Sequence, residues 1–250
     1  MALEPVELVV FDCDGALVDS ERICCRVDRE VFAGLGAEFT GAEIVERFAG
    51  SSHEALTAIL EERTGRPLEP GRHEPFRQRC EDAPDAELTA VEGVTDVLDA
   101  LSVPYCPASD GSHPTIRRNL GRTGLLERFA DRIFSAHDVA RGRPAPDLFL
   151  HAAAAMGVPP GRCAVVEDGP YGVGAARAAG TRAFGHCGGL TRADRLTGPG
   201  TVVFEDMRTP PGLLSGTGLQ TPLRGTGPVG HRPRSAGRVR RCGPGRSGRP

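Results

Sequence analysis

The 250-residue chain contains no lysine, so each of its 30 basic residues is an arginine. A nucleotide-binding P-loop requires Gly-Lys-Ser or Gly-Lys-Thr, which the absence of lysine excludes. No apolar run approaches the ~20 residues that span a bilayer, and no basic region precedes a long apolar stretch near the N-terminus. We therefore expect a cytoplasmic protein without a membrane partner.

The sequence also lacks the spacings of a disulfide framework or a zinc site. The eight cysteines are scattered, and none is part of a Cys-x-x-Cys pair. Several lie in apolar runs, where cysteine behaves as a small hydrophobic residue, so they are interpreted as reduced thiols. Four histidines, at 113, 137, 151 and 186, have no mutual spacing for a metal site and are interpreted as helix-start or surface residues.

Charge is distributed unevenly along the chain. Residues 1–208 carry 33 acids and 22 arginines, whereas residues 209–250 carry eight arginines and no acid. The acidic body argues against a nucleic-acid partner for the main domain. Of the last 42 residues, 17 are Gly or Pro, which leaves too little apolar surface to fold, so we expect a disordered basic tail over 209–250.

The pattern of apolar residues divides the rest of the chain into two parts. Residues 6–11 form a short apolar run typical of a buried strand. Up to residue 87 we then expect only helices, over about 19–34, 41–48, 52–63 and 72–82. From residue 92 strands alternate with helices. The expected strands are 103–108, 132–135, 163–167, 181–185 and 201–204, and the expected helices are 93–101, 112–120, 145–156 and 172–179.

This alternation predicts an α/β fold, a Rossmann-like three-layer structure around a parallel sheet with an all-helical insertion. In such sheets ligands bind beyond the carboxyl ends of the strands. Polar residues gather at three expected strand ends: Asp12 and Asp14, Ser109 and Asp110, and Glu167 and Asp168.

The two aspartates after the first strand predict phosphoryl chemistry. One carboxylate, Asp12, can attack phosphorus and form an aspartyl-phosphate, while the second, Asp14, transfers the proton of the leaving group and later of water. Several anionic oxygens beside a phosphate require a hard cation, which favours Mg²⁺ with Asp168 as a remote ligand and Glu167 as its support.

Other interpretations of these motifs are weaker. A calcium-binding EF-hand loop also begins with Asp-x-Asp-Gly, but it needs Gly at its sixth position, where Leu17 stands. The Asp14-Gly15 pair alone is also a common turn signal. Gly172-Val-Gly174 lacks the third glycine of a dinucleotide-binding loop.

The segment FDCDGALVDSE at 11–21 resembles the first motif of the haloacid dehalogenase-like superfamily, in its phosphatase and phosphomutase branch. PASDGS (107–112), RGRPAPDLFLHAA (141–153) and CAVVEDGPYGVGAARAAG (163–180) resemble the later motifs in order. The resemblance implies a core over 1–18 and 88–208 and a mobile helical cap over 19–87. It also implies that Ser109 and Arg143 hold the phosphoryl group, and that Mg²⁺ binds Asp12, the Asp14 carbonyl and Asp168.

The chain departs from the family pattern at two places. Arg143 stands where the third motif carries lysine, which keeps the charge but changes the donor geometry. Gly169-Pro170 replaces the usual Ser after Glu-Asp. The absence of lysine excludes the phosphonate-cleaving branch, which needs a cap lysine, and Asp14 argues against the dehalogenase branch.

Further stretches are similar to bacterial phosphogluconate phosphatases, among them ERFAG, AELTAVEGV and FSAHDVARGRPAPDLFLHAAAAMGV. This implies a small phosphorylated metabolite, such as 6-phosphogluconate, as substrate. Asp110, Arg47 and His53 are the candidate substrate-binding residues, although Arg47 and His53 are also explained as ordinary helix residues. A beta-phosphoglucomutase-type mutase and a weakened phosphate-binding regulatory module stay as alternatives, and we expect a monomer or weak dimer.

Overall fold

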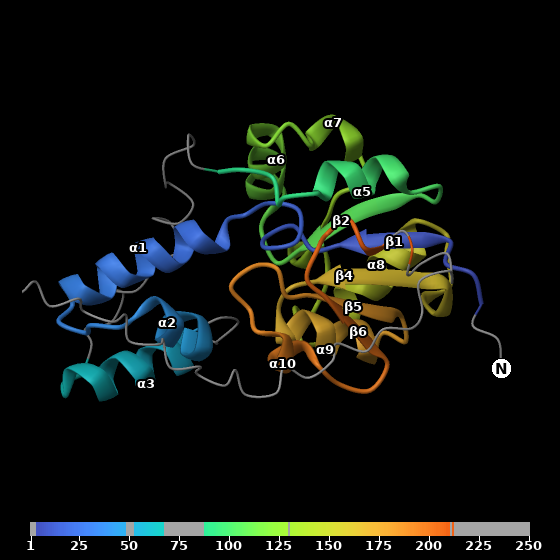
Figure 1. Cartoon of the computed structure of the whole chain (residues 1–250). Coiled ribbons are helices and arrows are strands. Elements are labelled where there is room, and N and C mark those ends of the chain that lie inside the picture. The colour runs from blue at the N-terminus through green and yellow to red at the C-terminus, as the bar shows by residue number, and fades with distance from the viewer. Residues whose placement is uncertain (1–3, 49–52, 68–87, 130, 211, 213–250) are drawn as a thin grey trace, which may run out of the picture. The chain divides into compact units, whose positions relative to one another are not determined.

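The computed structural model describes residues 4–48, 53–67, 88–129, 131–210 and 212 (Figure 1). These residues form a six-stranded sheet in the order β3-β2-β1-β4-β5-β6, and each neighbouring pair is parallel. The strands are β1 (Leu8–Phe11), β2 (Tyr105–Ser109), β3 (Phe134–Ser135), β4 (Cys163–Glu167), β5 (Arg182–His186) and β6 (Thr201–Phe204). The predicted α/β fold with a parallel sheet is confirmed.

Helices cover both faces of the sheet because successive strand residues point to opposite sides. In β1, Val9 and Phe11 belong to one apolar cluster, and Leu8 and Val10 belong to the other. The first cluster includes residues of α5 (Val94–Ala100), α6 (His113–Arg122) and α7 (Leu126–Phe129). The second includes residues of α8 (Asp147–Ala155), α9 (Pro170–Ala178) and α10 (Ala193–Leu196), which completes the three predicted layers (Figure 1).

Between β1 and α5 the described chain contains a series of helices, as predicted. It forms α1 (Glu21–Gly34), α2 (Gly41–Phe48) and α3 (His53–Thr64). These helices have an apolar cluster of their own, in which Phe32 packs edge-to-face on Phe39 at 5.7 Å between ring centroids. Leu60 of α3 is fully buried in this cluster. A separate core is what a helical insertion needs to fold beside a sheet domain.

A few elements differ from the sequence prediction. The strand expected over 132–135 is limited to Phe134–Ser135, which pairs with the end of β2. The short helices α7 and α10 were not predicted, because one helical turn is too short to show apolar periodicity. The helix expected over 72–82 and nearly all of the expected tail lie outside the described residues. Among the described residues, no helix is long and apolar enough to cross a membrane.

The strand order places the carboxyl end of β1 at a topological switch point. From β1 the chain proceeds outward through β2 to β3, and then returns to form β4 on the other side of β1. Loops at such a point diverge to opposite faces and leave a crevice beyond the strand ends. The residues that follow β1, β2 and β4 therefore meet at one edge of the sheet.

Candidate active site

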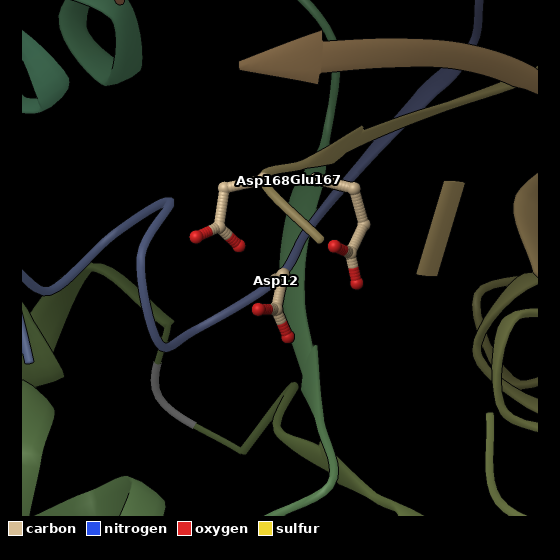
Figure 2. Close-up of side chains that lie close together, drawn as sticks. All are labelled: Asp12, Glu167 and Asp168. Carbon is tan, nitrogen blue, oxygen red and sulfur yellow. The ribbon is translucent and has the colours of Figure 1, made fainter. Parts of the chain in front are cut away.

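Three buried acids meet at the ends of β1 and β4. Asp12 follows β1, Glu167 ends β4, and Asp168 follows it. Phe11 is paired with Val166, and the Asp12 N–H donates to the Val166 carbonyl at 2.9 Å, so the two strand ends are adjacent. One carboxylate oxygen from each acid lies within 4.8 Å of the others (Figure 2). The structure therefore brings Asp12 and Asp168 together, as their strand-end positions predicted.

Arg143, in the loop before α8, faces this cluster. Its Nη1 lies 3.1 Å from Asp12 Oδ1 and also pairs with Glu167, while its Nε donates to Asp110 Oδ2 at 2.9 Å. The Arg143 side chain is only 13% exposed. One guanidinium thus interacts with three carboxylates, and its planar fork suits this better than an ammonium group would.

Glu167 is further fixed by two glycines. Its Oε2 accepts from the Gly169 N–H at 2.9 Å, while its Oε1 faces Arg143. Gly172 in α9 approaches so closely that a Cβ atom there would overlap the Glu167 carboxylate. Each carboxylate oxygen of Glu167 is therefore engaged by a donor, and its supporting role at a metal site stays a prediction.

Asp14 turns toward a different set of side chains. Its Oδ1 accepts from Ser20 Oγ at 2.9 Å and from Asn119 Nδ2 at 3.3 Å, and its Oδ2 accepts from Ser109 Oγ at 3.3 Å. Ser109 Oγ itself accepts from the Gly111 N–H at 3.1 Å. Ser109, predicted to hold phosphoryl oxygens, here contacts the second aspartate of the first motif.

On the other side of the cluster, Asp168 contacts Glu21, the first residue of α1. The two carboxyl groups are hydrogen-bonding neighbours, and Glu21 Oε2 also accepts from the Leu190 N–H at 3.4 Å. Gly15 lies against Asp168 with φ +89°, and a Cβ atom there would overlap the Asp168 carboxylate. Glycine is needed at this position both for the left-handed backbone and for the close approach.

Burial and mutual repulsion shape the charges of these groups. Burial raises the pKa of Asp12 well above its usual value, although Arg143 acts in the opposite direction. Burial, followed by the charge of Glu21, raises the pKa of Asp168 in the same way. Burial alone would lower the pKa of Arg143, but Asp12 and the two other acids around it hold that pKa well above its ordinary value. The guanidinium therefore stays charged.

The acids fit a hard divalent cation. In the part of the chain that the structure describes, Asp12 Oδ1 and Asp168 Oδ2 are buried oxygens that accept no hydrogen bond, although the charge of Arg143 lies 3.1 Å from Asp12 Oδ1. Burying carboxylate oxygens without a donor is costly, and a cation between them would lower that cost. Mg²⁺ prefers oxygen ligands, of which carboxylates are typical, so the cluster of Asp12, Glu167 and Asp168 could hold it.

The predicted substrate-binding residues are placed in different surroundings. Asp110, whose side chain is 50% exposed, is at the edge of the cluster as a partner of Arg143. Arg47 in α2 pairs with Glu62 in α3, with 2.8 Å between Nη2 and Oε2. His53 begins α3, but its side chain lies outside the described residues. The roles of these three residues stay predictions.

Three residues that contact the site were not predicted from the sequence: Ser20, Glu21 and Asn119. Ser20 and Glu21 lie in the segment FDCDGALVDSE, so their closeness in sequence to the two aspartates could have identified them as site residues. Asn119 could have been identified only as a polar residue on the otherwise apolar, buried stripe of α6.

The interpretation of His186 was wrong. It was expected at a helix start or on the surface, but it ends β5, where it pairs with Phe204 of β6, and it is only 3% exposed. Burial lowers the pKa of His186, which favours the neutral ring.

Comparison with known proteins places this geometry in a family. The haloacid dehalogenase-like hydrolase family model matches residues 6–180. The chain is 34% identical to 6-phosphogluconate phosphatase of Escherichia coli (strain K12), over 73% of this chain and 83% of that protein. It is 30% identical to fructose-1-phosphate phosphatase of the same organism, over 69% and 92%. A haloacid dehalogenase-like protein of unknown function from Agrobacterium tumefaciens has a TM-score of 0.79 and 35% identity, with 84% of this chain and 98% of that chain covered.

The chain belongs to the haloacid dehalogenase-like hydrolase family. Within that family it is a phosphatase.

Proposed function

We propose that this phosphatase is Mg²⁺-dependent and hydrolyses a small phosphorylated sugar, such as 6-phosphogluconate, through an aspartyl-phosphate on Asp12. The observation that carries the proposal is the buried cluster of Asp12, Glu167 and Asp168 with Arg143 at its side. Asp14 and Ser109 lie at the same edge of the sheet and contact one another. The relatives act on 6-phosphogluconate and fructose 1-phosphate, as their names state, which supports a sugar phosphate.

In the first step an Asp12 carboxylate oxygen forms a bond to phosphorus. The bond from phosphorus to the sugar oxygen breaks, its electron pair stays on that oxygen, and the protonated Asp14 carboxyl donates its proton to it. The products are the free sugar hydroxyl and an aspartyl-phosphate, while Asp14 is left as a carboxylate. Arg143 and Ser109 hold the phosphoryl oxygens and so stabilise the charge that they carry.

In the second step water attacks the phosphorus of the aspartyl-phosphate. The Asp14 carboxylate accepts a proton from that water as the new oxygen–phosphorus bond forms. The bond between phosphorus and the Asp12 oxygen breaks, and inorganic phosphate leaves. Both carboxyl groups thereby return to their starting protonation states.

Asp12, Asp168 and the Asp14 backbone carbonyl would hold Mg²⁺, with Glu167 supporting them. When bound, Mg²⁺ supplies positive charge that offsets the repulsion between the phosphate and these carboxylates. Glu21 contacts Asp168 from the outside and restricts its orientation.

We propose that residues 19–87 form a cap over a core of 1–18 and 88–208, and that the cap selects the substrate. Arg47 and His53, at the ends of α2 and α3, are the candidates for binding the anionic end of a sugar acid. Because Arg47 is paired with Glu62, binding of an anion there requires exchange of this partner.

The test uses the purified full chain with Mg²⁺ and either p-nitrophenyl phosphate or 6-phosphogluconate. Asp12→Asn should abolish turnover, because an amide cannot attack phosphorus, and EDTA should stop the wild-type enzyme. Asp131→Asn, at a fully exposed aspartate, is the matched control and should keep full activity. Full activity of Asp12→Asn would contradict the proposed mechanism. Formation of glucose 6-phosphate from beta-glucose 1-phosphate would identify the enzyme as a mutase instead.

A further inference from the structure

Asn119 is a polar residue on the buried face of α6. The residues of this helix that are buried are Ile116, Asn119 and Leu120, at the spacing of an apolar stripe. Ile116 and Leu120 pack in the core beneath the sheet, and Asn119 is only 8% exposed. A hydrophobic residue would be the usual choice here, and asparagine is a poor helix former. Asparagine at this position therefore calls for an explanation in its polar contacts.

The amide group of Asn119 meets the Asp14 carboxylate. Its Nδ2 donates to Asp14 Oδ1 at 3.3 Å, across 105 positions of sequence. Buried amide groups are costly unless they are hydrogen-bonded, so this contact compensates for the burial. It also joins a side chain from a rigid core helix to the loop that follows β1.

Asp14 receives its other two donors from two serines, of which Ser109 ends β2. Ser20 Oγ, in the segment before α1, donates to Oδ1 at 2.9 Å, and Ser109 Oγ donates to Oδ2 at 3.3 Å. Under the proposed function Ser109 must also serve the phosphoryl group. Asn119 is then the donor that can stay on Asp14 throughout turnover, because it lies inside a helix whose stripe is packed in the core.

We infer that Asn119 is a positioning residue, which holds the Asp14 carboxyl in the orientation that delivers its proton to the leaving oxygen. This inference rests on the proposed function, in which Asp14 protonates that oxygen while the bond to phosphorus breaks. Asn119 neither gains nor loses a proton and does not contact the substrate. Its removal leaves Asp14 Oδ1 with Ser20 as the remaining donor among the described side chains.

The experiment compares leaving groups. Values of kcat/KM are measured for a series that runs from p-nitrophenyl phosphate to alkyl and sugar phosphates, with the full chain and Mg²⁺. This parameter covers the steps up to transfer to Asp12, where an alkoxide needs a proton and p-nitrophenolate does not. Asn119→Leu should lower kcat/KM for alkyl phosphates ~10–100-fold, a part of the ~10²–10⁴-fold that general acids contribute, and p-nitrophenyl phosphate by less than about 3-fold.

Two further variants keep the result interpretable. Leu120→Ala, at the next residue on the same buried stripe, should lose stability but keep the wild-type ratio between the substrates. Asn119→Thr replaces the residue if Asn119→Leu does not fold, and it should show the same selective loss. Asp14→Asn should show that pattern more strongly.

The possible outcomes separate the two claims. An equal loss on all substrates in both Asn119 variants contradicts the positioning role and leaves the proposed function intact. No turnover of any phosphate by the wild-type enzyme overturns the proposed function and this inference together. A selective loss on poor leaving groups, absent from Leu120→Ala, supports the inference.

Discussion

Arg143→Met should destabilise the protein far more than loss of a surface ion pair would. Arg143 interacts with Asp12 and Glu167, whose side chains are only 3% and 1% exposed. Removing one partner of a buried ion pair leaves uncompensated charge and costs ~3–5 kcal/mol. For a domain of this size that corresponds to a fall in Tm of about 6–20 °C.

Urea unfolding at about pH 7.5 in EDTA, followed by far-UV circular dichroism, measures this cost. The matched control is Arg141→Met, two residues away, because Arg141 is 70% exposed in its pair with Asp147. Exposed pairs contribute ~0–1 kcal/mol, so this variant should unfold almost like the wild type.

The pH dependence of stability provides a second test with the same variant, Arg143→Met. The charge of Arg143 lowers the pKa of Asp12, against the larger effect of burial, so its loss raises that pKa further. A carboxyl whose pKa is raised in the folded state loses its stabilising contribution as the pH rises through that value. The deficit of Arg143→Met should therefore shrink as the pH falls from about 7.5 to about 5. Equal stability of the two variants, or a deficit that grows on acidification, would refute the reasoning.

Two further predictions concern stability at single positions. Alanine is a better helix former than glycine, but Gly172→Ala in α9 should destabilise the protein by ~1–3 kcal/mol because its Cβ would overlap Glu167. Gly174 in the same helix has open space around it, so Gly174→Ala should instead stabilise the protein by up to ~1 kcal/mol. Urea midpoints compare the pair, and the same sign for both would contradict the overlap argument. Burial raises the pKa of Asp28 to about 6, so its stabilising contribution is lost between about pH 4 and pH 6 as the pH rises. Asp28→Asn should then be more stable than wild type by ~1–3 kcal/mol at about pH 8 and equal to it near pH 4, and an unchanged difference across that range would contradict this.

The sheet and the strand-end acids followed from the sequence because both depend on local patterns. Apolar runs bounded by polar turns identified all six strands, with β3 shorter than expected, and the same pattern placed Asp12 and Asp168 at neighbouring strand ends. Parallel topology then fixes which ends meet, without further information.

Contacts made by long side chains from loops did not follow from the sequence. The interaction of Arg143 with three acids depends on the path of the loop before α8, which no periodicity encodes. The contact of Asn119 with Asp14 depends on the rotation of α6 about its axis. His186 was interpreted as a helix-start or surface residue, whereas pairing with Phe204 of β6 places it at the buried end of β5. Pairing between strands is set by tertiary structure and does not show in a local pattern.

The order of strands along the chain also has a consequence for how the acidic cluster is assembled during synthesis. β1 is made first, but β4, its neighbour with the remaining acids, follows only after β2, β3 and α8. Arg143 precedes α8, so the counter-charge for Asp12 emerges before Glu167 and Asp168 do. A domain generally folds as a unit, so the sheet closes only once β4 has been made. Arg143 is then already present when Glu167 and Asp168 are brought beside Asp12, and the repulsion among the three acids is met by a counter-charge as the cluster forms.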